Sequence, residues 1–383
     1  MFGIIYKMCD YARFLSFANN KMPEDINPSP EIEKGTEKFD SITHFLQTGG
    51  FMYSVFDMGR KVDSISNVEF ERIEGQQAFY PAPFQKKASV ALLFWEPEKQ
   101  AESVIWFLQF PIDEMGYLKQ EARDAFLIDL LEQTGKNIQA KQQGKSALDE
   151  LNESPFAFKP NPDRLAMFHA LATKRLEQSP SNYYNHTQDY LSGTAGYEQW
   201  QFLGLQGVAD IVARLDEDNN EALLAEALGE MPEAPLVSFC SALENVHPKS
   251  QLTEALISKL KITLQAGSNN QLVAMLVRAI SGALPEKMRD ETLQLVLTSK
   301  LGSDIEVMAA ISGRAWNALY SPPVLAAFMT NLGVQTELAF NAILADLMMI
   351  PSMRELIFSE LKNHEQSADL NEKLSQFMKT LTI

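Results

Sequence analysis

Five charged side chains near the ends of the expected strands are the candidates for chemistry in this sequence. They are Asp57, Arg60, Asp113, Glu114 and Arg123. Polar residues at strand ends can converge on a cleft, where a carboxylate beside an arginine could bind a ligand or carry out acid/base work. The same residue types also suit a hairpin turn, a turn before a helix, and ion pairing. Turn chemistry is favoured, so these residues are ligand-binding candidates only and no catalytic residue is assigned.

Recognised catalytic and metal-binding motifs do not occur in the sequence. The histidines lack metal-ligand spacing, and there is no nucleophile elbow, Walker loop or dinucleotide-binding glycine pattern. Asp216 to Asn220 resembles the start of a calcium loop, but Glu221 and Ala227 stand where such a loop needs glycine and glutamate. A helix N-cap is the favoured interpretation. We therefore expect no metal and no cofactor, and a non-enzymatic role is favoured.

Gly193 to Gly196 match the bare GxxG spacing of a loop that clamps nucleic acid. The four residues that follow, Tyr197 to Trp200, include no basic side chain. A turn that leads into a helix is therefore the favoured interpretation. RNA binding is kept as a minor alternative, which predicts salt-sensitive retention on RNA.

Composition restricts the class of partner. The chain has 383 residues, with Lys+Arg 33 against Asp+Glu 50 and a net charge of -17. Such an acidic surface disfavours nucleic acid and anionic membranes and favours a protein partner with a basic patch. The only cysteines, Cys9 and Cys240, favour a reducing cytoplasm. No apolar run approaches the roughly 20 residues of a membrane-spanning helix.

The first half of the chain carries strand patterns. Ala88–Trp95 and Val104–Phe110 are apolar on both faces and are predicted to be central strands. Phe51–Ser66 is predicted to form a hairpin, and a helix should follow from Leu118 to Gly135. The expectation is a small antiparallel sheet with helices, an α+β domain over residues 39–160.

From Gly196 onward the pattern is helical, with short breakers between segments of roughly 11 to 17 residues. Arg278-Ala279 and Arg314-Ala315 stand in similar helical contexts, 314 − 278 = 36 positions apart. Such a period suits paired helices that stack into a HEAT-like α-solenoid. Because the repeat is degenerate, a compact helical bundle remains the alternative.

The expected division of the chain follows from these patterns. Residues 1–38 are predicted to be an extension and a disordered linker, because the proline- and acid-rich part cannot bury a core. The α+β domain covers 39–160, a helical connector covers 161–195, and the α-helical repeat domain covers 196–383.

Three motifs together resemble a known family. They are YSVFDMGRKV at Tyr53 to Val62, YPAPFQ at Tyr80 to Gln85, and VIWFLQFPIDEMGYLKQEARDAF at Val104 to Phe126. In this order they resemble DUF3549, a gammaproteobacterial family of domains of unknown function, over most of the chain from about Phe39. The resemblance implies a soluble bacterial protein and carries over no activity, ligand or catalytic residue. The segment before Phe39 departs from the family pattern.

The functional expectation is a cytoplasmic, non-enzymatic protein-interaction or scaffold module with a protein partner. The alternative is an enzyme or small-ligand receptor, with its site at the strand ends of the first domain or in an interdomain cleft. The oligomeric state is left open.

Overall fold

The structure is a computed structural model that describes residues 39–140, 154–267, 269–363 and 368–381. The extension and linker expected at 1–38 therefore lie outside the described residues. Contacts divide the chain into two compact units. The first, here called the sheet unit, comprises 39–57, 64–80, 86–140 and 154–159 of the described residues. The second, called the helical unit, comprises Met58–Asp63, Pro81–Gln85 and the chain from Pro160 onward.

The sheet unit is built on four strands. They are β1 (Met52–Asp57), β2 (Asp63–Ile65), β3 (Lys87–Trp95) and β4 (Val104–Pro111), in the order β2-β1-β3-β4. β3 pairs antiparallel with both β1 and β4. Both apolar runs expected to be strands are therefore strands, and they are direct neighbours.

One detail of the strand prediction is wrong, because β4 is the last strand in the order and not a central one. Its burial alternates along its length, whereas β3 is buried almost throughout. The outer edge of β4 instead bonds to a short segment near the end of the unit. Gln109 N donates to Phe156 O at 2.8 Å, and Phe158 N donates to Phe107 O at 3.1 Å. This segment satisfies backbone groups that a free edge would expose.

Three helices cover the sheet of this unit: α2 (Ile42–Thr48), α3 (Asn67–Glu74) and α4 (Gln120–Ala140). Ser41 caps α2 and Gly49 ends it. Their apolar side chains join those of the strands in one core that includes Phe45, Phe110 and Phe126. α4 continues past Gly135, where the sequence predicted its end, because a single glycine costs a helix only about 1 kcal/mol.

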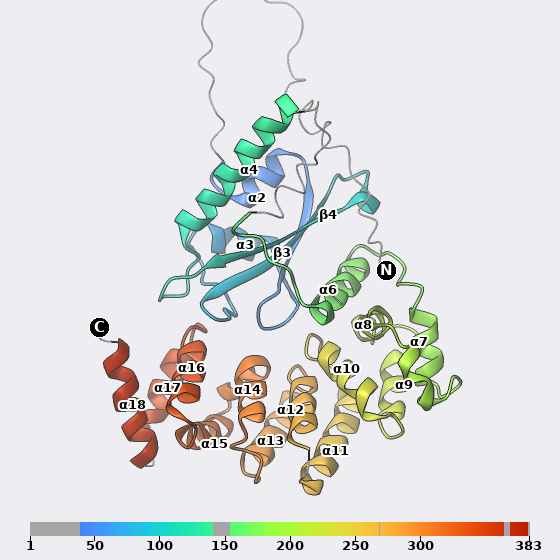
Figure 1. Cartoon of the computed structure of the whole chain (residues 1–383), viewed down its shortest axis with the longest axis vertical. Helices are drawn as coiled ribbons and strands as arrows, with labels where there is room; N and C mark the ends of the chain where they lie inside the picture. The colour runs from blue at the N-terminus through green and yellow to red at the C-terminus, as the bar shows by residue number, and fades with distance from the viewer. Residues whose placement is uncertain (1–38, 141–153, 268, 364–367, 382–383) are drawn as a thin grey trace, which may run out of the picture. The chain divides into compact units, whose positions relative to one another are not determined.

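The described part of the helical unit contains helices and no strand after Pro160, as expected from its sequence (Figure 1). The α-helices are α6 (Pro162–Arg175), α7 (Tyr184–Leu191), α8 (Leu205–Ala213), α9 (Asn220–Ala227), α10 (Glu233–Leu243), α11 (Ser250–Ala266), α12 (Asn270–Ala279), α13 (Glu286–Leu297), α14 (Ile305–Arg314), α15 (Pro322–Gly333), α16 (Glu337–Leu347), α17 (Met353–Asn363) and α18 (Ala368–Leu381). Two 3-10 helices, η2 (Tyr197–Phe202) and η3 (Trp316–Tyr320), connect them. The cap of α6 is Asn161, whose side chain accepts from Arg164 N.

The helices of this unit pack in two rows. In the first row, α8, α10, α12, α14 and α16 each pack against the next, as Figure 1 shows for α10 to α16. In the second row, α9 packs against α11, and α13 packs against α15. The short loops impose this order, because they bring consecutive helices back antiparallel.

Side chains at the helix starts tie the first row together. Asn269, the cap of α12, donates to the Glu233 carboxylate of α10 at 3.0 Å. Its neighbour Asn270 donates to Asp304, the cap of α14, at 2.8 Å. The starts of α10, α12 and α14, which are neighbours in the row, are thus aligned at one edge.

Candidate functional site

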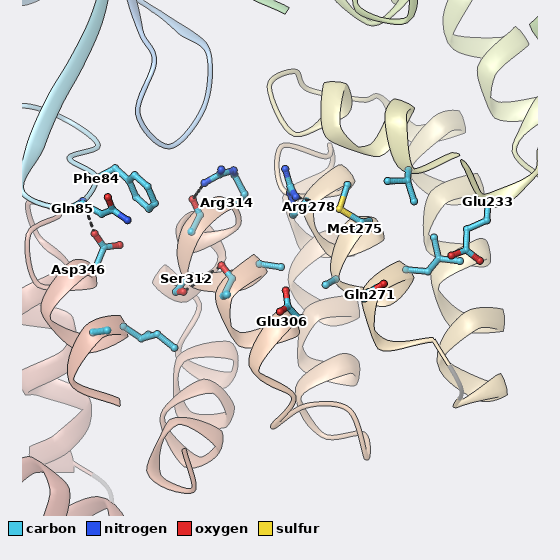
Figure 2. A pocket seen from close by; sticks show the side chains of 18 residues that line it. Phe84, Gln85, Glu233, Gln271, Met275, Arg278, Glu306, Ser312, Arg314 and Asp346 are labelled. Atoms are coloured by element: carbon cyan, nitrogen blue, oxygen red, sulfur yellow. Dashed lines mark hydrogen bonds between the residues drawn. The ribbon is translucent and has the colours of Figure 1, made fainter. Parts of the chain in front are cut away.

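A groove of about 650 Å³ crosses the first row of helices (Figure 2). Residues of α10, α12, α14 and α16 line it, together with Phe84 and Gln85 of the segment Pro81–Gln85. All of these residues belong to the helical unit. The groove therefore lies within one compact unit.

Small side chains along the lining leave the space that forms the groove. The lining includes Ala274, Ala309, Ala310, Gly313 and Ala342. A Cβ atom at Gly313 would meet no neighbouring heavy atom within 4 Å. A larger side chain at this position would extend into open space, so missing side-chain volume shapes the groove.

Two arginines from different helices meet on one carboxylate at the side of the groove. Glu244, which follows α10, is only 2% exposed. Its Oε2 accepts from Arg278 Nε at 2.5 Å, and its Oε1 accepts from Arg314 Nε at 2.9 Å. Both arginines line the groove and are labelled in Figure 2. A single buried acid thus fixes two guanidinium groups side by side.

Arg60 holds the segment Pro81–Gln85 in the same unit. Its side chain is fully buried and donates to Pro83 O at 2.8 Å and to Ser312 O at 3.0 Å. It also pairs with the Asp346 carboxylate at 2.7 Å. The other oxygen of Asp346 accepts from Gln85 N at 2.9 Å (Figure 2). Arg60 and Asp346 therefore bind main-chain groups of a non-helical segment.

Aromatic rings surround these cations. The Arg60 guanidinium lies 5.5 Å from the centroids of both Phe84 and Trp316. The centroid of the Phe84 ring also lies 5.8 Å from Cζ of the Arg314 guanidinium. Such contacts favour a cation over a ring face by about 0.5 to 2 kcal/mol. Phe84 therefore links the Arg60 and Arg314 sites at one end of the groove.

The five sequence candidates are divided between the two units. Arg60 belongs to the helical unit, and the other four belong to the sheet unit. Asp57 is buried and accepts from the Tyr80 hydroxyl at 2.6 Å. Burial, and then the nearby Asp57 charge, raises the pKa of Tyr80 well above its usual value. This pair has a structural role inside the sheet unit.

Asp113 and Arg123 also have local partners. Asp113 Oδ1 accepts from Met115 N and Tyr117 N, both at 2.9 Å, which shapes a turn. Glu114 is an exposed residue of the same turn. Arg123 donates to Glu74 O at 2.6 Å. These contacts account for the two residues as parts of a turn and of a helix packing contact.

Arg123 also forms an ion pair with Asp124. Glu74, whose carbonyl oxygen accepts from Arg123, joins two helices through its carboxylate. The Glu74 carboxylate accepts from Ile42 N at 2.8 Å and from the Thr43 hydroxyl at 2.6 Å. Burial raises the pKa of Glu74, while the hydrogen bonds from Thr43 and Ile42 oppose that rise. The residue therefore connects α3 to the start of α2.

Sequence reasoning missed the acidic partners of the groove arginines. Arg278 and Arg314 were singled out, but only as marks of a repeat. Glu244 and Asp346 carried no signal, because their partners come from distant segments. The repeated arginine and the candidate Arg60 were the sequence features that pointed at this surface.

The other sequence motifs have local explanations. Gly193 and Gly196 both have positive φ, 76° and 81°, and form a turn between α7 and η2. Asp216 pairs with Lys174, and Asp218 accepts from the Tyr184 hydroxyl at 2.9 Å. Within the described residues, no group of three or more potential ligands could hold a metal ion. No helix in the described part of the chain is long and apolar enough to cross a membrane.

Lys61 is a nearly buried cation next to this region. It is 9% exposed, and its ammonium lies 5.3 Å from the Trp316 ring centroid. Burial lowers the pKa of Lys61 to about 8, although the charges of Glu244 and Asp63 act to raise it. The folded protein therefore holds this proton less tightly than the unfolded chain does.

We expect Lys61→Met to reveal this effect as a pH-dependent difference in stability. The unfolded chain binds more protons between about pH 8 and pH 10.5, so wild type gains stability relative to the variant across that window. The gain is about 3 kcal/mol at most. Denaturation at several pH values measures it, with Lys287→Met as an exposed control. A constant difference between wild type and Lys61→Met would contradict the assignment.

Comparison with known proteins identifies the family. The profile of the family described as "Protein of unknown function (DUF3549)" matches residues 37–378. No curated protein and no solved structure matches the chain significantly. Because the match covers most of the sequence, the chain belongs to this family, as its motifs predicted.

Proposed function

We propose that this member of the DUF3549 family is a non-enzymatic protein-interaction module whose helical unit binds a segment of a partner protein in the groove. The observation that carries the proposal is the segment Pro81–Gln85, which lies at one end of the groove (Figure 2). Its backbone is bound by Arg60 and Asp346. The groove surface therefore already binds a non-helical segment of this chain.

The chemistry of the groove supports binding over catalysis. Arg278 and Arg314 are paired with Glu244, and Asp346 is paired with Arg60. Catalytic groups need a free position beside the reacting atom of a substrate. In this groove the charged side chains are already paired with each other and lie beside small apolar residues. They therefore form a binding surface and not a reactive centre.

The architecture supports the same proposal. We infer that the two rows of helices are an α-solenoid, in which helix pairs stack and present one continuous face. Its support is the alignment of the helix starts and the equivalent places of Arg278 and Arg314, each in the last turn of its helix. We also propose that 161–195 supplies the first pair of the stack, because α6 and α7 both pack against α8.

Charge and composition complete the proposal. The net charge of -17 favours a partner with a basic surface, because long-range attraction speeds encounter. The scarcity of cysteine and the family resemblance favour the bacterial cytoplasm as the compartment.

A random peptide library displayed on phage and selected on the full-length protein tests the groove. We expect selected peptides, resynthesised and measured by fluorescence anisotropy, to bind wild type at least tenfold more tightly than Gly313→Trp. The reason is that the new side chain extends into the groove.

The matched control is Ile262→Trp on α11. Ile262 is 65% exposed and lies outside the groove lining, so this variant should bind like wild type. Two results would refute the proposal: a selection that yields no binding peptide, or peptides that bind Gly313→Trp as tightly as wild type.

A further inference from the structure

We propose that Arg278 and Arg314 bind main-chain carbonyl oxygens of an extended peptide segment in the groove. This inference rests on the proposed function and specifies what the groove recognises: the backbone of the segment, with no charged side chain required.

The two arginines keep hydrogen-bond donors that the fold does not use. In each arginine, Nε donates a hydrogen bond to the Glu244 carboxylate. Arg278 Nη1 reaches Met275 Sδ at 3.2 Å, and Arg314 Nη1 reaches Gly313 O at 3.0 Å. Nη2 of neither arginine has a hydrogen-bond partner within the described residues. Their side chains are 27% and 16% exposed and line the groove.

Two other arginines of the same unit already bind chain segments in this way. Arg60 donates to Pro83 O at 2.8 Å. Arg164 donates to Met58 O at 2.6 Å and also to Gly59 O. Each acceptor carbonyl lies outside a helix, where it has no intrahelical partner. Carbonyl binding by arginine is thus how this unit holds its own non-helical segments.

The charges around the pair favour a neutral acceptor over an anion. The two guanidinium groups share the negative charge of Glu244. Both also lie in the last turns of α12 and α14, where each offsets about half a negative charge of the helix dipole. The pair itself therefore carries little net positive charge to attract a carboxylate or phosphate. What remains are N–H donors, and a peptide carbonyl satisfies them without adding charge.

Geometry favours an extended chain. Because both Nε atoms bond to oxygens of one carboxylate, the two guanidinium groups are close neighbours. Along one side of an extended chain, carbonyls of residues i and i+2 recur every ~6.8 Å. A helical partner would hide its carbonyls in its own hydrogen bonds. Apolar lining residues such as Leu272 and Met275 can then contact the side chains of the segment.

Thioamide scanning of a selected peptide tests the inference on the full-length protein. Replacing one carbonyl oxygen by sulfur weakens it as an acceptor and leaves every side chain unchanged. We expect one position, or two positions two residues apart, at which the change weakens binding to wild type about fivefold. In Arg278→Gln and Arg278→Lys the sensitivity should be lost at the position that Arg278 binds, because neither side chain retains Nη2, while a second position bound by Arg314 should stay sensitive. Arg175→Gln, an exposed arginine of α6, should behave like wild type.

The outcomes separate this inference from the proposed function. Equal thioamide sensitivity in wild type and both Arg278 variants, or none in wild type, would overturn carbonyl binding while the Gly313→Trp result still stands for the groove. Peptides that need an aspartate or glutamate, and that lose affinity more than tenfold between low and moderate salt, would show an anion site and also overturn it. Each measurement is the ratio of the affinities of the unmodified and the thioamide peptide for the same protein. A general loss of protein stability affects both peptides equally and does not produce the expected difference.

Discussion

Arg60→Met is expected to lower the free energy of unfolding of the helical unit by about 3–5 kcal/mol. The side chain is fully buried and makes hydrogen bonds to Pro83, Ser312 and Asp346. Methionine fills similar volume but donates to none of them. The carbonyl oxygens lose a donor, and the Asp346 carboxylate loses its cation. Leaving such groups unpaired costs more than the ion pair contributes.

Urea denaturation followed by circular dichroism measures this loss, and hydrogen exchange localises it to α14 and α16. Arg60→Lys should recover little, because a lysine ammonium cannot reproduce the planar fork that reaches several acceptors at once. The control is Arg72→Met, since Arg72 is 52% exposed and its pair with Glu69 contributes at most about 1 kcal/mol. An Arg60 effect as small as the Arg72 effect would contradict the structural role.

Glu244→Gln is the second substitution with a large expected effect, a loss of about 3–5 kcal/mol. Glutamine keeps the shape of the side chain but removes the negative charge that both arginines share. Its one carbonyl oxygen can accept from one arginine, while its amide hydrogens face the N–H donor of the other. Glu244 is 2% exposed, so water cannot replace the lost bond.

A double-mutant cycle tests whether Glu244 acts through the arginines. In the Glu244→Gln background, Arg278→Met should cost less than it does in wild type, because its partner has already been removed. The expected coupling is about 1 kcal/mol or more, measured as the difference between the two costs. Additive costs, or a small effect of Glu244→Gln alone, would show that the bridge does not stabilise the fold.

The local structure of this chain was largely predictable. The continuous apolar runs at Ala88–Trp95 and Val104–Phe110 predicted β3 and β4. These features depend on backbone propensity and on contacts within a few residues, which the sequence shows directly. The order of strands was less predictable, because the apolar sequence of β4 resembles that of a central strand although β4 lies at the edge.

The candidate site residues were grouped by their places in the expected secondary structure. Asp57 and Arg60 were grouped because both lie near the ends of expected strands, and they belong to different units with different partners. Neighbours in sequence share a turn, but their side chains can point into separate cores. Proximity along the chain therefore does not fix which side chains share partners.

The sequence by itself determined the acidic charge, the two kinds of secondary structure and the recurrence of arginine at Arg278 and Arg314. Only the tertiary structure decided that these two arginines meet on Glu244 and that Arg60 pairs with Asp346, 286 positions away. Helices and turns follow from interactions along the chain, whereas such pairs depend on how packed helices align. That alignment arises from side-chain packing across the whole unit, so no spacing in the sequence records it.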